Sequence, residues 1–231
     1  MKDKVLAAYS KLARDYETNV DVTSGFNAYY ERPAMMKLLP NDMTGSRVLD
    51  AGCAAGWYTE QLIKRGANLT AIDLSPEMVE ATKRRVGRQA RVLEQDLSES
   101  LPFDDEAFDI ILSSLTLHYI DDWTSTFQEF NRVMKLGAQL IFSVHHPYYF
   151  AHELLEEVWS KKESGRVEVA FSRRPLSEIV NTTTRYFVLE RIIEPQPVAE
   201  FEEKLPEKAT SYDYLMKNPH FLIIVAHKAA L

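Results

Sequence analysis

The chain has 231 residues, of which 45% are hydrophobic and 26% charged, the composition of an ordinary globular protein. Its 27 basic and 34 acidic side chains give a formal net charge of −7, which disfavours a general nucleic-acid-binding protein because polyanions are repelled. The single cysteine, Cys53, excludes an internal disulfide framework and an all-cysteine metal site. No apolar run approaches the roughly 20 residues of a membrane span, and the N-terminus lacks the apolar core of a signal peptide. We therefore expect one cytoplasmic domain over residues 1–231, without a membrane or metal partner.

Residues 1–40 have the apolar spacing of helices. One helical face of the first segment would carry these side chains: Val5, Leu6, Tyr9, Leu12, Ala13 and Tyr16. A second helix is expected over residues 26–40, bent or split near Pro33 because proline lacks the amide hydrogen that the helix interior requires. We expect the two helices to form an N-terminal cap.

Residues 41–146 alternate between strand and helix patterns. Strands are predicted at residues 47–52, 69–74, 91–96, 108–114 and 138–144, and helices at residues 57–66, 75–87 and 121–137. Ser75 and Pro76 have the chemistry of an N-cap and a first helical position. Strands separated by helices of this length pair in parallel, so the pattern predicts an α/β fold with a doubly wound, Rossmann-like sheet.

The alternation stops after His146. Residues 147–175 are too polar for a second core and include a hairpin-like pattern, so we expect an insertion packed over the sheet. A helix and a sixth strand follow within residues 175–197, and a last strand is expected within residues 216–231. We expect residues 147–215 to form, with the N-terminal cap, the wall of a substrate pocket.

The stretch VLDAGCAAG places Gly52 and Gly56 in a tight turn between the first strand and its helix. Gly52 permits a sharp turn, and Gly56 permits the helix to pack close to the strand and leaves room for a ligand. The dinucleotide fingerprint G-x-G-x-x-G does not fit, because Ala54 and Trp57 stand where it requires glycine. The turn therefore disfavours a nicotinamide cofactor.

Two acids follow at neighbouring strand ends. Asp73 ends the second predicted strand, where a carboxylate can accept hydrogen bonds from both hydroxyls of a ribose. Asp96 ends the third, where a carboxylate can accept the amino group of adenine. A glycine turn, a ribose acid and an adenine acid at three successive strand ends predict an adenosine site without a required phosphate.

From Val48 to Val144 the chain resembles the class I S-adenosylmethionine-dependent methyltransferases, and most of all their small-molecule type 11 branch. The matching elements are LDAGCAAG, AIDLSPEMVEAT, EQDLSESLPFDDEAFDIILSSLTLHYIDD and FNRVMKLGAQLIFSV. The resemblance implies a seven-stranded, mainly parallel sheet with an antiparallel last strand, and S-adenosylmethionine as cofactor. It implies these cofactor-binding residues: Tyr16, Gly52, Ala54, Asp73, Leu74, Asp96, Leu97 and Ser113. Many members have glycine in place of Ala54.

Two histidines are candidates for catalysis. His118 follows the fourth predicted strand and His146 ends the fifth, on the rim where an acceptor would approach the methyl group. A neutral imidazole there could take a proton, since its ordinary pKa of about 6.5 lies near neutrality. Side chains alternate along a strand, so only one of His145 and His146 can face the pocket, and we favour His146. A packing role for either residue is the alternative.

These observations predict an enzyme that transfers a methyl group from S-adenosylmethionine to an oxygen, nitrogen or carbon atom of a small-molecule acceptor. An RNA or protein methyltransferase is the first alternative. The acidic net charge counts against it, and so does SSLTL at the place where amine-methylating enzymes of nucleic acids carry their tetrapeptide. A non-catalytic sensor of S-adenosylmethionine is the second alternative. We expect a monomer or homodimer.

Overall fold

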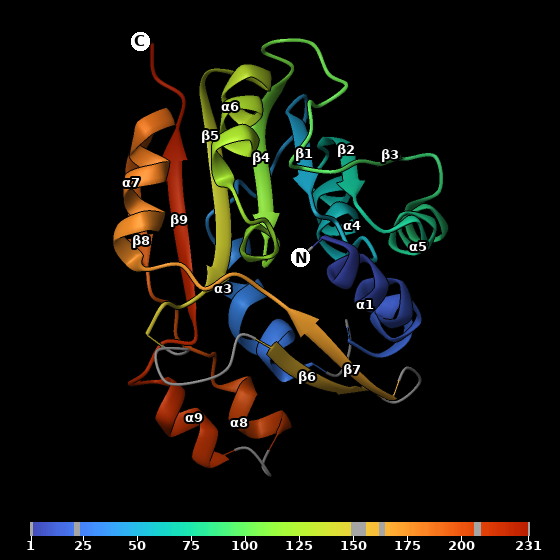
Figure 1. Ribbon diagram of the computed structural model, residues 1–231, viewed down its shortest axis with the longest axis vertical. Coiled ribbons are helices and arrows are strands. Elements are labelled where there is room, and N and C mark those ends of the chain that lie inside the picture. Colours follow the sequence, from blue (N-terminus) through green and yellow to red (C-terminus); the bar gives the residue numbers. More distant parts are fainter. Residues whose placement is uncertain (1, 21–23, 149–155, 162–164, 206–208, 231) are drawn as a thin grey trace.

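A computed structural model of the protein describes residues 2–20, 24–148, 156–161, 165–205 and 209–230. Seven strands form one sheet in the order β3-β2-β1-β4-β5-β9-β8 (Figure 1). Strands β1 to β5 are parallel, β9 is antiparallel to β5, and β8 is antiparallel to β9. The bounds are β1 Arg47–Ala51, β2 Asn68–Asp73, β3 Ala90–Glu94, β4 Phe108–Ser114, β5 Met134–His145, β8 Val188–Ile193 and β9 Phe221–His227. The predicted fold class, a doubly wound Rossmann-like sheet with an antiparallel last strand, is confirmed.

Helices surround the sheet close to the places that the sequence predicts. The larger helices and the short helical segments are α1 Lys2–Asp15, α3 Arg32–Met36, α4 Trp57–Lys64, α5 Pro76–Val86, α6 Trp123–Val133, α7 Leu176–Tyr186, α8 Glu200–Lys204 and α9 Ala209–Leu215. At the start of α5 the Ser75 side chain accepts a hydrogen bond from the Met78 amide at 3.3 Å, as its N-cap chemistry predicts. None of the helices in the described part of the chain is long and apolar enough to cross a membrane.

The second N-terminal helix is split near Pro33, as the sequence predicts: a π-helical turn covers Asn27–Glu31, and α3 then begins with Pro33 in its first turn, where the missing amide hydrogen costs little. Two helix predictions differ from the structure at their ends. Helix α3 ends at Met36, before the predicted end at residue 40. Helix α6 ends at Val133, four residues before the predicted end at Gly137. Met134 instead starts β5 by pairing with Phe108, so the strand is longer than the sequence suggested.

The strands bury alternate side chains against different helices. Leu49 and Phe142 belong to a core with α6 and α7, whereas Val48 and Ile141 belong to a core with α3 and α4. Figure 1 shows the helices on both sides of the sheet. This alternation decides which strand-end side chains face the N-terminal cap, because odd-numbered residues of β5 lie on the α3 and α4 face.

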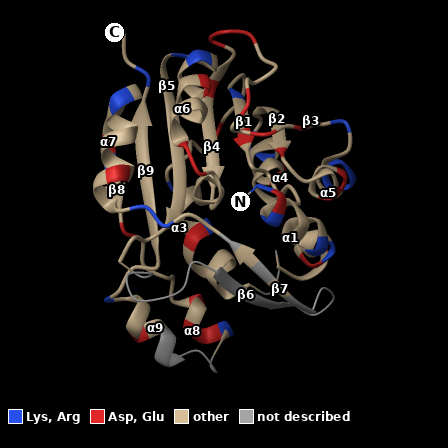
Figure 2. Ribbon diagram, viewed as in Figure 1, with Lys and Arg blue, Asp and Glu red and all other residues tan. Residues whose placement is uncertain are grey.

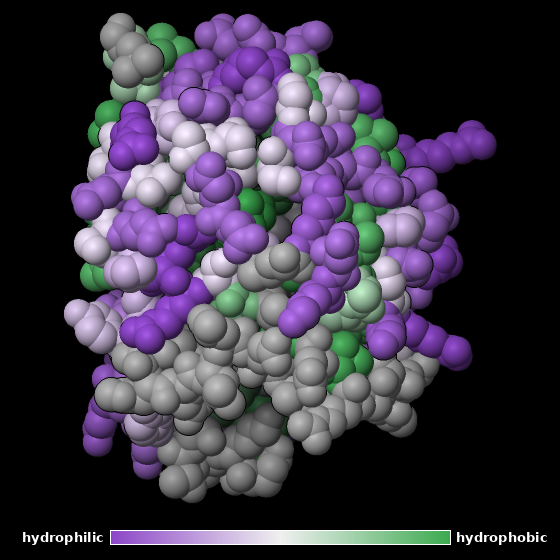
Figure 3. All heavy atoms as spheres, viewed as in Figure 1, coloured by the Kyte–Doolittle hydropathy of each residue, from purple (hydrophilic) through white to green (hydrophobic). Residues whose placement is uncertain are grey.

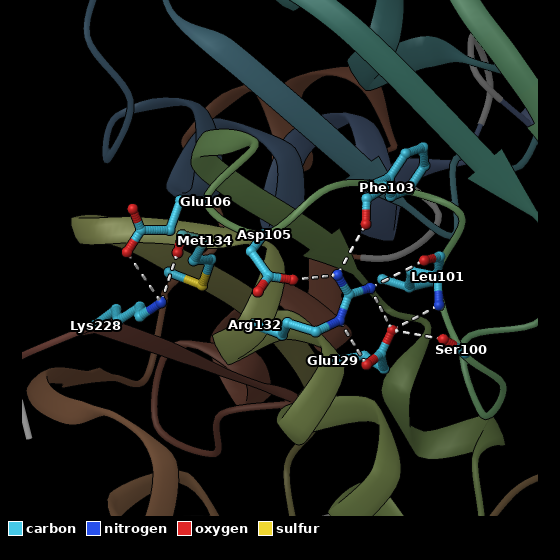
Figure 4. A network of polar contacts seen from close by, with 9 residues as sticks. All are labelled: Ser100, Leu101, Phe103, Asp105, Glu106, Glu129, Arg132, Met134 and Lys228. Carbon is cyan, nitrogen blue, oxygen red and sulfur yellow. Dashed lines mark hydrogen bonds and ion pairs between the residues drawn. The ribbon is translucent and has the colours of Figure 1, made fainter.

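A polar network fixes the far end of the sheet (Figure 4). The Arg132 guanidinium on α6 donates to the carbonyl oxygens of Leu101 and Phe103, at 3.0 and 2.8 Å, and to the carboxylate of Glu129 at 2.7 Å. The hydrogen bond from Arg132 lowers the pKa of Glu129 to about 2. This network ties the loop before β4 to α6 and holds the sheet that carries the site.

The N-terminal cap and a hairpin lie beyond the carboxyl ends of the parallel strands (Figure 1). Strands β6 Glu156–Lys161 and β7 Gly165–Ala170 form a separate antiparallel pair, within the segment where the sequence has its hairpin-like pattern. Val167 and Val169 of β7 pack in one cluster with Leu12 of α1. Residues 149–155 and 162–164 of the expected insertion lie outside the described residues.

Candidate active site

A cavity of about 690 Å³ opens at the carboxyl ends of the five parallel strands. Residues at or just after the end of each strand line the cavity. Taken across the sheet from β3 to β5, one from each strand is Asp96, Asp73, Gly52, Ser114 and His145. In the view of Figure 3, apolar side chains lie in a recess at the centre of the face, with hydrophilic side chains around it. Such a row of polar groups over an apolar floor is typical of a ligand site at the switch point of a doubly wound sheet.

The glycine turn after β1 has the close packing that its sequence predicts. Gly52 has a φ of +85°, and a Cβ atom added there would lie 2.3 Å from the Thr116 side chain. Gly56 has a φ of +79°, and its added Cβ would lie 2.8 Å from the Thr82 side chain. Ala54 also has a positive φ, +47°, a backbone conformation that glycine adopts more readily than alanine.

Asp73 organises this turn. One carboxylate oxygen accepts a hydrogen bond from the Ala54 amide at 2.9 Å, and the other accepts one from the Ser75 amide at 2.9 Å. Burial raises the pKa of Asp73 to about 6, although these amide hydrogen bonds oppose the rise. The carboxylate is therefore ionised at neutral pH and remains able to accept further hydrogen bonds from a ligand in the cavity.

Asp96 lies two residues after β3, at the other end of the row. Lys2 of α1 forms an ion pair with it at 2.5 Å, and the Ser98 amide donates to it at 2.8 Å. Burial raises the pKa of Asp96, but the hydrogen bonds from Lys2 and Ser98 outweigh that effect and lower it below the ordinary value. The first helix therefore reaches the wall of the cavity beside the third strand.

The other predicted cofactor residues divide into two groups. Tyr16, Ala54, Leu74 and Leu97 line the cavity, as the resemblance implied. Ser113 does not belong to the described lining: it is buried, and its hydroxyl donates to the Ala51 carbonyl at 2.8 Å. The wall is formed instead by the next residues, Ser114 to Thr116, because Ser114 has the strand parity that faces the N-terminal cap.

Neither of the two histidines chosen from the sequence belongs to the lining of this cavity, although the His118 ring packs behind His145, with ring centroids 4.5 Å apart. His118 is buried in the turn Leu117–Tyr119, and burial lowers its pKa well below the ordinary value. His146 is buried on the opposite side of β5, where its Nε2 lies 2.9 Å from a Glu194 carboxylate oxygen. The expectation that His146 rather than His145 faces the pocket is corrected by the structure, since His145 lines the cavity and His146 does not.

Among the described residues, the histidines that line the cavity are His145 and His220. His220 precedes β9, and its ring centroid lies 5.4 Å from that of His145. Burial lowers the pKa of His145 to about 4, so its ring is neutral at neutral pH. Alternation along β5 places Ser143 and His145 on one face and Phe142 and Val144 on the other, so the sequence separates His145 from His146 without showing which of them faces the cavity.

Two charged residues of the N-terminal cap also line the cavity, and the sequence analysis missed them. Glu31 is 1% exposed and Arg32 is 6% exposed, and both lie in the segment read only as a helix. Among the described residues, none between 147 and 215 belongs to the lining, so the expectation that this segment forms the pocket wall finds no support there. The lining comes from the cap, the strand ends and the loops and helix starts that follow them, and from His220 with Phe221.

Comparisons with known proteins agree with this geometry. Residues 49–142 match the family model described as a methyltransferase domain. Malonyl-[acyl-carrier protein] O-methyltransferase of Erwinia pyrifoliae is 32% identical over 144 residues, which are 62% of this chain and 51% of that protein. The chain thus spans about half the length of the curated relatives that it matches first.

Solved structures share the fold over nearly their whole length. The S-adenosylmethionine dependent methyltransferase from Mesorhizobium loti has a TM-score of 0.71 at 24% identity, over 86% of this chain and 97% of that one. The 1,6-didemethyltoxoflavin-N1-methyltransferase of Burkholderia thailandensis, solved with 1,6-didemethyltoxoflavin and S-adenosylhomocysteine, has a TM-score of 0.62 at 18% identity, over 99% and 88%. Residues 49–142 thus match a methyltransferase domain, and the chain has the fold of the solved S-adenosylmethionine dependent methyltransferases to which it is similar.

Proposed function

We propose that the protein binds S-adenosylmethionine in the cavity and transfers its methyl group to a small-molecule acceptor. One observation carries the proposal: Asp96, Asp73 and the Gly52 turn follow three adjacent strands and face one cavity. An added Cβ at Gly52 would collide with the Thr116 side chain, so the backbone of the turn packs directly against Thr116 and has no room for a larger residue. These carboxylate acceptors fit an adenosine without a phosphate, because the acidic side chains of the lining would repel a phosphate group.

Each residue in the row has a distinct task. Asp73 accepts hydrogen bonds from the ribose hydroxyls, and Asp96 accepts one from the adenine amino group. Leu74 and Leu97 provide apolar walls for the adenine ring. When bound, S-adenosylmethionine supplies an electrophilic methyl group, so the protein mainly contributes positioning and exclusion of water.

The acceptor site is proposed at the β5 and β9 end of the cavity, beyond the glycine turn. His145, His220 and Phe221 line it, which gives a partly apolar surface with two imidazole groups. A histidine with a pKa of about 4 is a weak base at neutral pH, so we propose that His145 orients the acceptor by a hydrogen bond. Similar proteins are named for different methyl acceptors, malonyl-[acyl-carrier protein] and 1,6-didemethyltoxoflavin, so the fold alone does not identify the acceptor of this protein.

The net charge of −7 supports a small acceptor over RNA. In the ribbon of Figure 2, basic positions are interspersed with acidic ones along helices such as α1 and α5.

The test is methyl transfer from S-adenosylmethionine labelled with tritium in the methyl group. Label should enter the small-molecule fraction of a metabolite extract, and calorimetry should show one S-adenosylhomocysteine bound per chain. Label in RNA or protein alone would favour the first alternative, and binding without any transfer would favour a sensor. Failure to bind S-adenosylhomocysteine would refute the proposal.

A further inference from the structure

We propose that Glu31 and Arg32 bind the amino-acid end of the cofactor, with Glu31 on the α-ammonium group and Arg32 on the carboxylate. The inference rests on the proposed function, since it concerns the same cavity. It gives the N-terminal cap a role in cofactor recognition that the sequence motifs at the strand ends do not predict.

Glu31 is a buried carboxylate held by hydroxyl groups from three different elements. The Tyr58 hydroxyl donates to it at 2.7 Å, the Ser114 hydroxyl at 2.8 Å and the Ser143 hydroxyl at 2.5 Å. A carboxylate can accept about four hydrogen bonds, so capacity remains for a further donor. Within the described residues no lysine, arginine or histidine forms an ion pair with Glu31.

A buried carboxylate without a cation is costly, and a ligand ammonium group would offset that cost. The hydroxyl groups fix the orientation of Glu31 before a ligand arrives. Because Glu31 lines the cavity at the ends of β4 and β5, a cation bound there would lie next to the glycine turn in the row of strand ends.

Arg32 supplies the complementary charge. Its guanidinium carbon lies 4.2 Å from the centroid of the Trp57 ring, and both residues line the cavity. Trp57 is the first residue of α4, so Arg32 lies near a helix N-terminus, which itself favours an anion. A planar guanidinium stacked on an aromatic ring is a typical partner for a carboxylate.

Consecutive residues of opposite charge thus match the zwitterion of an α-amino acid. The strand order places this pair after Asp96, Asp73 and Gly52, and before His145, along the same rim. Adenine, ribose and amino-acid groups follow one another in the same order in the cofactor. The competing interpretation is that Glu31 only fastens the N-terminal cap to β4 and β5.

Calorimetry with three ligands separates these interpretations. S-adenosylhomocysteine has the whole amino-acid end, its deaminated analogue keeps only the carboxylate, and 5′-methylthioadenosine has neither group. For Glu31→Gln, which retains size and hydrogen bonding, we expect about tenfold or more weaker binding of S-adenosylhomocysteine and unchanged binding of the other two. For Arg32→Gln we expect weaker binding of both carboxylate ligands and unchanged binding of 5′-methylthioadenosine.

Glu17→Gln is the matched control, since Glu17 pairs with Arg84 outside the cavity and all three affinities should be retained. An equal loss of all three ligands in the Glu31 variant, with or without a lower melting temperature, would show a fastening role and overturn the inference. Wild-type affinity of that variant for S-adenosylhomocysteine would overturn it as well. In the unmodified protein, equal affinity for 5′-methylthioadenosine and S-adenosylhomocysteine would refute the inference alone, whereas binding of neither would refute the proposed function.

Discussion

Acidification should weaken cofactor binding through Asp73. The carboxylate must be ionised to accept hydrogen bonds from both ribose hydroxyls, and burial raises its pKa to about 6 in the free protein. Binding therefore competes with protonation as the pH falls through 6. The dissociation constant of S-adenosylhomocysteine should therefore rise on acidification and stay constant above neutrality.

The size of the effect follows from that pKa. One pH unit below it, about ten of every eleven Asp73 carboxyls are protonated, so the dissociation constant at pH 5 should be about tenfold that at pH 7.5. Two other lining groups, Asp96 and His145, change little over this range, because the pKa of Asp96 is lowered and that of His145 is about 4. Asp50 is the main competing group, since burial raises its pKa to about 7.

Calorimetric titrations at pH 5.0, 6.0 and 7.5 provide the assay, with two variants as controls. Asp73→Asn should bind S-adenosylhomocysteine about tenfold or more weakly at pH 7.5 and show no further loss at pH 5. Asp50→Asn should keep the wild-type pH profile, because Asp50 is bonded to Thr59 and does not line the cavity. A flat wild-type profile, or one abolished by the Asp50 substitution, would refute the assignment of Asp73.

Three further predictions concern the turn, the acceptor site and the polar network. Gly52→Ala should reduce S-adenosylhomocysteine affinity at least tenfold, whereas Gly137→Ala, with a φ of +77° and nothing within 4 Å, should cost only about 1 kcal/mol of stability. His145→Ala should reduce label transfer to the small-molecule fraction about a hundredfold at unchanged S-adenosylhomocysteine affinity, whereas His146→Ala should reduce it little. Arg132→Met should lower the unfolding free energy in urea by about 2 kcal/mol and leave binding unchanged, because it leaves two loop carbonyl groups without their donor.

The sheet and its cofactor row could be predicted because they depend on local patterns. Short apolar strands, separated by helices with recognisable starts, predict parallel pairing whatever the rest of the chain does. Asp73 and Asp96 then follow from the ends of their strands, and the structure places both on the cavity. The predicted end of α6 was wrong because helical spacing continues through Met134 in the sequence. Only the pairing of Met134 with Phe108 shows that the strand has begun there.

The acceptor side could not be read in the same way, because it depends on which face of β5 the N-terminal cap covers. Alternation correctly separates His145 from His146 but does not say which face meets the cap. The decisive contact is between Glu31 and Ser143, which lie 112 residues apart in the sequence. Once that contact is known, His145 must face the cavity, because it is two residues beyond Ser143 on the same strand.

The contact between Glu31 and Ser143 also indicates that the N-terminal cap does more than cover the cavity. The three hydroxyl donors of Glu31 come from α4, β4 and β5, so the cap is bonded to the helix that begins after the glycine turn and to two neighbouring strands, of which β5 ends at the proposed acceptor site. A segment that only covered the cavity would need apolar contacts, whereas this one buries the Glu31 carboxylate in the cavity wall. Burying a charge costs stability, and the proposed ligand ammonium group gives that cost a function. Cofactor recognition and the orientation of the acceptor site would then depend on one buried carboxylate.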